Sequence, residues 1–365
     1  MKTILVLSLM VGITLSLGAD GPTQGYQLLR TLHPSDANFR EAPGQVLFSP
    51  SGKLYAAYRV PGKSGTSSRL RVVLFDPVTG QQGNMRDYPV PGASLPRVAT
   101  AFLLSQDGST LVYAELHVPQ VIVTIEAATL NPQSTSDASL FGEQDFAPHV
   151  SIVSTESLVL SAGKWTHDGR ATAVHEVRKI SLSPRNLRQV LSEKSIPLDE
   201  DISEVAYWLK RVHTQREVGQ VLPTNDGMLG LTNAMSEGWI QLFDQTGMEL
   251  ATLHNPDCGF VRASLSPDQQ VGVAVCERTG LDETQFGETL RRDAVVFDVK
   301  TLKVIATIPT SRASVKEHGP ARGDLWVSAP CPAAWHGKDR VLVALPDFPD
   351  SINIYSIPEP TPTMH

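Results

Sequence analysis

The sequence predicts an all-β protein assembled from copies of one antiparallel unit, and two neighbouring stretches carry this prediction. Residues 46–58 read as a strand, the turn Ser-Pro-Ser-Gly at 49–52 and a second strand; residues 70–80 read as a third strand that ends in another turn. Proline presets such turns and glycine relieves them. The chain is also rich in Val, Leu, Thr, Gly and Pro, which is typical of short strands joined by many turns.

The beginning of the chain has the pattern of a secretory signal peptide. Residues 1–19 contain Lys2, an apolar run over 3–17 and small residues at the end. The run of about 15 apolar residues is shorter than the roughly 20 that a membrane-spanning helix needs. We therefore expect an exported protein, secreted or periplasmic, with one domain over residues 20–357 and a disordered, proline-rich tail over 358–365.

Composition limits the classes of partner. The 365 residues carry a formal net charge of −7, and no block of basic residues occurs, so a nucleic-acid surface is not expected. The apolar fraction of 41% is enough for a proper core. No further apolar run has membrane-spanning length, so we expect no membrane span after signal removal. We also expect a monomeric protein.

Six units follow one another along the chain, each with three or four short strands. Their strands are predicted at residues 46–48, 54–58, 71–75 and 85–90; 99–104, 111–116 and 121–125; 150–153, 157–161, 174–182 and 187–191; 219–222, 229–232, 239–243 and 249–253; 260–265, 271–276, 294–297 and 304–308; and 333–335, 341–345 and 352–357.

The sixth unit lacks a fourth strand, whereas residues 26–32 form a strand without a unit. Joining the two gives a single β-propeller of six four-stranded blades, closed by the N-terminal strand that completes the last blade. Seven blades are the alternative, if residues 196–218 contain a degenerate blade. We favour a short helix there, because Asp201 and Glu204 resemble a capping box and apolar residues over 202–212 have helical spacing.

The repeated turns carry a resemblance to a known group of proteins. Phe-Ser-Pro-Ser-Gly-Lys-Leu at 48–54 and Ser-Leu-Ser-Pro-Asp at 264–268 are followed by Leu-Phe-Asp-Pro-Val-Thr-Gly at 74–80 and Val-Phe-Asp-Val-Lys-Thr at 296–301. These segments resemble the repeats of WD40-like and YVTN-type β-propellers of the loose bacterial group, since the Gly-His and Trp-Asp punctuation of true WD40 repeats is absent. The resemblance implies a propeller fold and does not specify an activity, because such propellers include lactonases, dehydrogenase subunits and scaffolds.

Three aspartates occupy equivalent positions after a phenylalanine. Asp76, Asp244 and Asp298 each begin a turn between the last two strands of a unit. Carboxylates can bind metals, but these three belong to different units. We expect each to accept hydrogen bonds from backbone N–H groups of its own turn.

Long connections are predicted at one end of the units only. They cover residues 61–69, 131–149, 163–170, 277–293 and 310–326. Propellers commonly bind partners where long loops gather. The predicted ligand-binding rim consists of Lys164, Trp165, His167, Asp168, Arg170, Arg291, Arg292 and His318.

The functional prediction is a binding or scaffold module that recognises a protein, peptide or glycan through this rim. The alternative is a metal-dependent hydrolase or lactonase-like enzyme with its site at the channel mouth. We favour binding without catalysis, because no Gly-x-Ser-x-Gly elbow, phosphate-binding glycine loop or haem-attachment motif occurs. We expect no cofactor and no metal, since His149, His167 and His318 have no ligand spacing.

The three cysteines leave two interpretations open. Cys258 and Cys276 lie at nearly equal distances from the turn at 266–268, so they are expected opposite each other on neighbouring strands. One interpretation is a cross-strand disulfide between them, with Cys331 left over. The other is three buried thiols that pack as small apolar side chains.

Overall fold

The chain folds into antiparallel β-sheets, and the expected all-β class is confirmed. Within the described residues every regular element is a strand and none is a helix. The computed structural model describes residues 25–34, 45–61, 68–90, 100–105, 108–115, 121–136, 146–154, 157–165, 171–183, 186–196, 217–225, 227–234, 237–244, 248–282, 287–310, 313–314, 331–347 and 351–358.

The described strands form six sheets, numbered here along the chain. Sheet 1 contains β2 (Gln45–Phe48), β3 (Leu54–Pro61), β4 (Ser68–Phe75) and β5 (Gln82–Val90), and sheet 2 contains β6 (Thr100–Leu104), β7 (Thr110–Glu115), β8 (Val121–Glu126) and β9 (Pro132–Ser136). Sheet 3 contains β10 (Phe146–Ser154), β11 (Ser157–Trp165), β12 (Ala171–Ser183) and β13 (Asn186–Ile196), and sheet 4 contains β14 (Glu217–Thr224), β15 (Gly227–Ala234), β16 (Glu237–Asp244) and β17 (Glu249–Asn255).

The last two sheets depart from this simple order. Sheet 5 contains β18 (Gly259–Leu265), β19 (Val271–Asp282), β20 (Gly287–Asp298) and β21 (Val304–Pro309), with the short β22 (Ala313–Ser314) paired to β20. Sheet 6 contains β23 (Ala333–His336), β24 (Arg340–Asp347), β25 (Ser351–Pro358) and, outermost, β1 (Gln27–Leu32) from the other end of the chain. Strand β1 is antiparallel to β25, with Gln27 opposite Ser356 and Leu32 opposite Ile352.

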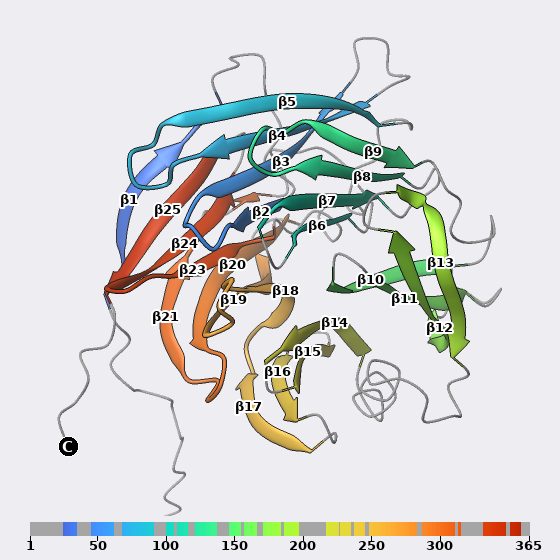
Figure 1. Ribbon diagram of the computed structural model, residues 1–365. Helices are drawn as coiled ribbons and strands as arrows, with labels where there is room; N and C mark the ends of the chain where they lie inside the picture. Colours follow the sequence, from blue (N-terminus) through green and yellow to red (C-terminus); the bar gives the residue numbers. More distant parts are fainter. Residues whose placement is uncertain are drawn as a thin grey trace, which may run out of the picture.

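Neighbouring sheets meet through their first strands. Strand β2 contacts β6 and β23, β10 contacts β6 and β14, and β18 contacts β14 and β23. Figure 1 shows the sheets spread around a common centre, with β2, β18 and β23 near it and β5, β13 and β17 at the periphery.

The core lies between sheets, which explains the continuous apolar runs in their central strands. In β3, Ala56 and Tyr58 pack against sheet 6, whereas Tyr55 and Ala57, at the alternate positions, pack against sheet 2. Successive side chains of a strand point to opposite faces, so a strand with a sheet on each side must be apolar at every position. The outer strand β17 instead alternates between exposed and half-buried residues.

The turn between the first two strands of a sheet repeats in detail. The Oγ atoms of Ser49, Ser105 and Ser266 accept hydrogen bonds from the backbone N–H groups of Lys53, Thr110 and Val271, at 3.0, 2.8 and 3.1 Å. All three serines are buried. A buried hydroxyl that satisfies a backbone donor explains why serine precedes each of these turns.

The aspartates after phenylalanine cap the turns between the last two strands. Asp76 Oδ1 accepts from the N–H groups of Val78 and Thr79 at 3.0 and 2.9 Å, and Asp298 Oδ1 accepts from the N–H of Thr301 at 2.7 Å. Asp244 Oδ1 accepts from the N–H of Met248 at 2.9 Å. The predicted structural role of these carboxylates is confirmed.

Several predictions about connections need correction or fall outside the described residues. The predicted loop over residues 277–293 is wrong, because all of its described residues belong to β19 and β20. The predicted connection over 131–149 contains β9 and the start of β10. The signal segment at 1–19, the helix over 202–212 and the tail beyond Pro358 lie outside the described residues.

Candidate functional site

The two ends of the sheets differ in the way that they connect strands. One end, which we call the hairpin end, carries the tight turns at 49–52, 76–80, 105–108, 266–269 and 298–302, each closed by backbone hydrogen bonds. The opposite end, the long-connection end, is where β3 leads to β4 and β19 leads to β20. The predicted rim residues that the structure describes, Lys164, Trp165, Arg291 and Arg292, belong to strands at this second end.

The structure places four of the eight predicted rim residues. Lys164 and Trp165 end β11, opposite Phe146 and Ala171. Arg291 and Arg292 lie in β20 of sheet 5, so sheet 4 separates them from the first pair. The described residues therefore do not bring these four together. The other four, His167, Asp168, Arg170 and His318, lie outside the described residues.

The long-connection end carries one element that the sequence did not predict, a long β-ribbon. Strands β19 and β20 pair over 12 residues each, from Val271 opposite Asp298 to Asp282 opposite Gly287. Strand β18 pairs with β19 only as far as Glu277. Beyond that residue, no described strand pairs with the outer edge of β19, while β22 covers part of the β20 edge at Thr289 and Leu290. We call residues 277–282 and 287–292 the ribbon.

The register of the ribbon places Arg292 opposite Glu277 and Arg291 opposite Arg278.

Sheet 1 contributes a buried ion pair that sequence reasoning missed. Arg71 of β4 donates from Nε and Nη2 to the two carboxylate oxygens of Asp87 on β5, at 2.6 and 2.9 Å. The Arg71 side chain is only 11% exposed. Arg69 Nη1 lies 3.6 Å from Asp87 Oδ2 at a more exposed position. Because this bidentate geometry uses both carboxylate oxygens, the pair is built to hold β4 and β5 together.

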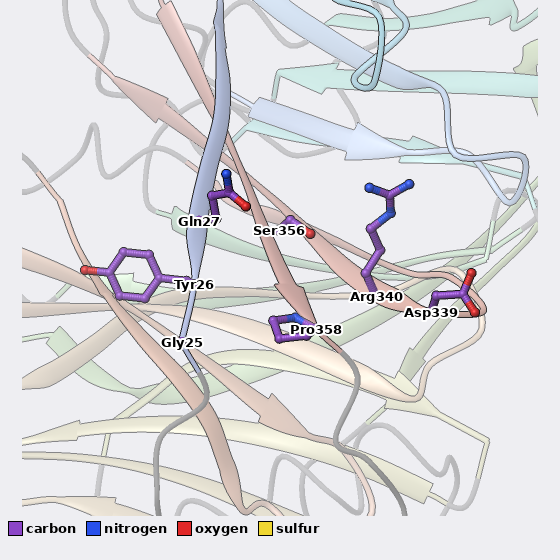
Figure 2. Close-up of a pocket in the computed structure, with 7 residues that line it drawn as sticks. All are labelled: Gly25, Tyr26, Gln27, Asp339, Arg340, Ser356 and Pro358. Carbon is purple, nitrogen blue, oxygen red and sulfur yellow. The ribbon is translucent and has the colours of Figure 1, made fainter.

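A shallow pocket of about 490 Å³ lies at the hairpin end of sheet 6. Its lining comes from both ends of the chain, with Gln27 on β1, Ser356 on β25 and Arg340 on β24 (Figure 2). In the same view Tyr26 points away from these three residues. The remaining lining residues are Gly25, Asp339 and Pro358. None of the predicted site residues belongs to this pocket.

The structure joins Cys258 and Cys276 in a disulfide, with their Cα atoms 5.6 Å apart. The two cysteines are not register partners, because Phe260 lies opposite Cys276 and an irregularity follows at Val261. The expectation of directly opposed positions is therefore wrong, although the bridge joins neighbouring segments. Cys331 is a free thiol in a parallel bridge with Gln45, and burial raises the pKa of this thiol.

In the described part of the chain, no group of three or more His, Cys, Asp and Glu side chains has the arrangement of a metal site. His149 lies in β10, opposite Ser161, and the other two histidines of the rejected metal set are outside the described residues. No helix in these segments is long and apolar enough to cross a membrane.

No family model and no curated protein matches the chain. The solved structures that are similar to it include the following three. A chain of the Mitotic Checkpoint Complex has 10% identity and a TM-score of 0.44, covering 98% of this chain and 100% of its own. The Cps50 (Swd1) β-propeller domain of Myceliophteria thermophila has 9% identity and a TM-score of 0.45, covering 91% and 100%. The C-terminal WD40 domain of Sif2 has 9% identity and a TM-score of 0.40, covering 93% and 100%.

At these identities and TM-scores we base no argument on the similarity. The kinship with YVTN-type repeats stays a prediction.

Proposed function

We propose that the six sheets are the blades of one β-propeller, and that this propeller is an interaction module. Three observations support the ring. Sheets 1 to 4 each have four strands in sequential order, and sheet 5 has the same order with β22 added to β20. The first strands of neighbouring sheets contact one another from β2 round to β23, and β23 contacts β2. The pairing of β1 with β25 places the two ends of the described chain in one blade. A four-stranded blade with apolar faces needs a neighbour on each side, which a ring supplies.

The interaction role rests on one observation: no described strand pairs with the outer edge of β19 in the ribbon. An unpaired strand presents N–H and C=O groups that an extended peptide can join as an additional strand. Proteins usually cover or shorten such edges, and the other hairpins of this end pair over fewer residues. We therefore propose that the partner is a protein that offers an extended segment to β19.

The test is a variant with the ribbon removed. Arg278 and Arg291 are register partners, so a two-residue Asn-Gly turn can join them directly in place of residues 279–290. The immobilised full-length chain should retain a specific partner that this shortened variant loses by at least about tenfold in affinity. The same partner, once purified, should bind the unmodified chain directly.

Lys300→Glu is the matched control, because Lys300 is an exposed residue in a turn at the hairpin end of the same sheet. Partner binding should survive this change. Thermal unfolding of the shortened variant within a few degrees of the parent shows that the blade is intact. Equal capture by the shortened variant contradicts the proposed role of the ribbon.

We also propose that the protein is exported and loses residues 1–19. The Cys258–Cys276 disulfide supports this, because disulfides persist mainly in oxidising compartments. N-terminal sequencing of the protein from the periplasm or medium of an expressing cell should begin at Asp20. Recovery of full-length chain in the cytoplasm alone contradicts export.

A further inference from the structure

The pocket at the hairpin end of sheet 6 contains hydrogen-bonding side chains that the fold itself does not use. No described residue hydrogen-bonds to the guanidinium of Arg340, the amide of Gln27 or the hydroxyl of Ser356. Two cations of sheet 1 are paired instead: Lys53 Nζ lies 2.7 Å from Asp76, and Arg71 binds Asp87 through two nitrogens. Arg340, Gln27 and Ser356 line one pocket together.

The three side chains come together because of the register of sheet 6. Gln27 is opposite Ser356, Ser356 is opposite Leu342, and Arg340 is opposite Pro358. Residues related in this way share a face of the sheet. Figure 2 shows Gln27, Ser356 and Arg340 on that common face, with Pro358 beside them.

We propose that this pocket binds a small molecule or chain end that carries a carboxylate next to an amide. The guanidinium of Arg340 offers two parallel N–H donors, the geometry that matches a carboxylate. Gln27 and Ser356 each both donate and accept, so they match the N–H and C=O of an amide. Gly25 adds room, because a Cβ placed there would meet nothing within 4 Å.

Asp339 narrows the choice of ligand. Its carboxylate also lines the pocket, so the side chains of Asp339 and Arg340 carry no net charge together. A phosphate dianion gains more attraction from Arg340 and equally more repulsion from Asp339, so this neutral pair gives a second negative charge no net advantage over a single carboxylate. The pocket volume of about 490 Å³ falls within the range for small-molecule sites. The ligand class is thus an N-acylated amino acid or the C-terminal residue of a peptide.

The experiment is a saturation-transfer NMR titration of the full-length protein with N-acetyl-L-alanine. We expect saturable binding at millimolar concentration, because an exposed charge pair contributes little affinity. Arg340→Ala should weaken the affinity by about three- to fivefold, and Arg340→Lys should weaken it less than that, since lysine keeps the charge and loses the paired donors. N-acetyl-L-alanine amide, which has no carboxylate, should not bind.

The control variant is Lys300→Ala, which removes the same charge at a turn outside the pocket. It should leave the affinity unchanged. A second arm uses a short peptide with a free C-terminus against the same peptide with an amidated C-terminus, which separates a chain end from a free acyl amino acid as the ligand.

Three results overturn the proposal. These are the absence of saturable binding, equal affinity in the parent and Arg340→Ala, and equal weakening by Lys300→Ala. Inorganic phosphate that binds more tightly than N-acetyl-L-alanine overturns the carboxylate assignment as well. The Arg340 side chain makes no hydrogen bond within the described residues, so both Arg340 variants should fold. A thermal unfolding curve that matches the parent confirms that each variant is folded.

Discussion

Nδ1 of His336 lies 2.6 Å from Oδ2 of Asp268, and the contact joins sheet 6 to sheet 5 at the hairpin end. The preceding residue, Trp335, faces the other neighbour, where its Nε1 donates to the carbonyl oxygen of Pro50 at 3.3 Å. Two successive residues of β23 thus hold the corresponding turns of both adjacent sheets. The alternation of side chains along a strand makes this double contact possible.

Removing either contact should lower the free energy of unfolding by a modest amount, and the two losses should be independent of each other. Trp335→Phe loses the bond to Pro50 and part of the ring that packs on Gly52, so we expect a loss of about 1–2 kcal/mol in the free energy of unfolding. His336→Gln should cost less than about 1 kcal/mol, because Asp268 is partly exposed. Urea unfolding of both single variants and the double variant measures these values, and a double variant no weaker than His336→Gln contradicts the role of Trp335.

Lowering the pH should reduce the contribution of the Asp76 turn to the free energy of unfolding, in a pH range that follows from the pKa of this residue. The hydrogen bond from Lys53, followed by that from the N–H of Thr79, holds the pKa of Asp76 well below its usual value. A carboxyl group whose pKa is lowered by folding stabilises the folded state at pH values above its unfolded pKa of about 4. This contribution is lost as the pH falls from there toward the folded pKa. Asp76→Asn should therefore be less stable than the parent at pH 7. The difference should shrink progressively below pH 4, as measured by urea unfolding at several pH values; a difference independent of pH contradicts this account.

Gln269→Gly should raise the free energy of unfolding by about 0.5–1 kcal/mol, because glycine adopts a positive φ without backbone strain. This net gain is what remains after the larger conformational entropy of glycine in the unfolded chain has opposed it. Gln269 has φ of 59°, and its Oε1 is buried without a partner among the described residues. The equivalent turn of sheet 1 has Gly52, with φ of 79°.

Leu302→Gly is the matched control, because Leu302 also has positive φ but packs in the core between sheets 4 and 5. It should destabilise by about 2–4 kcal/mol, since the lost burial outweighs the relieved backbone. Thermal and urea unfolding measure both. A loss of stability in Gln269→Gly is the result that would contradict the strain argument.

The Cys258–Cys276 bridge should protect both residues from alkylation. Denatured protein without reductant should accept one alkyl group, at Cys331, and reduced protein should accept three, as read from intact mass. Cys258→Ala should lower stability by about 3 kcal/mol, the entropy expected for closing a loop of this size. Reductant should then cause no further loss in the variant, and alkylation of three thiols before reduction excludes the bridge.

The sequence predicts strands well where both faces are buried and poorly where strands are polar. β24 is apolar at nearly every position, and the predicted strand over 341–345 falls within two residues of both its ends. The prediction for β3 has the correct start at Leu54 but stops at Tyr58, before the polar Arg59, whereas the strand continues to Pro61. β9 reads Pro-Gln-Ser-Thr-Ser, and the ribbon mixes Glu277, Arg278 and Gly280, so neither has the alternation that predicts a strand. Only pairing with a neighbour makes them strands.

The pocket illustrates a second limit. Gln27 and Arg340 belong to opposite ends of the chain, and each alone reads as an ordinary surface residue. Only the pairing of β1 with β25 brings them to one face. No local sequence pattern specifies which residues of these two strands lie opposite each other. The sequence therefore predicts that residues 26–32 join the sixth unit, but not which side chains this brings together.

The same pairing has a consequence for synthesis. β1 leaves the ribosome early, yet its partner β25 is made among the last described residues. Until then the first strand has no hydrogen-bonding neighbour in its own sheet, and an edge of this kind is prone to wrong pairing. The nascent chain must therefore stay unaggregated through nearly its entire translation, and truncation before Ser351 should leave a product that depends on chaperones.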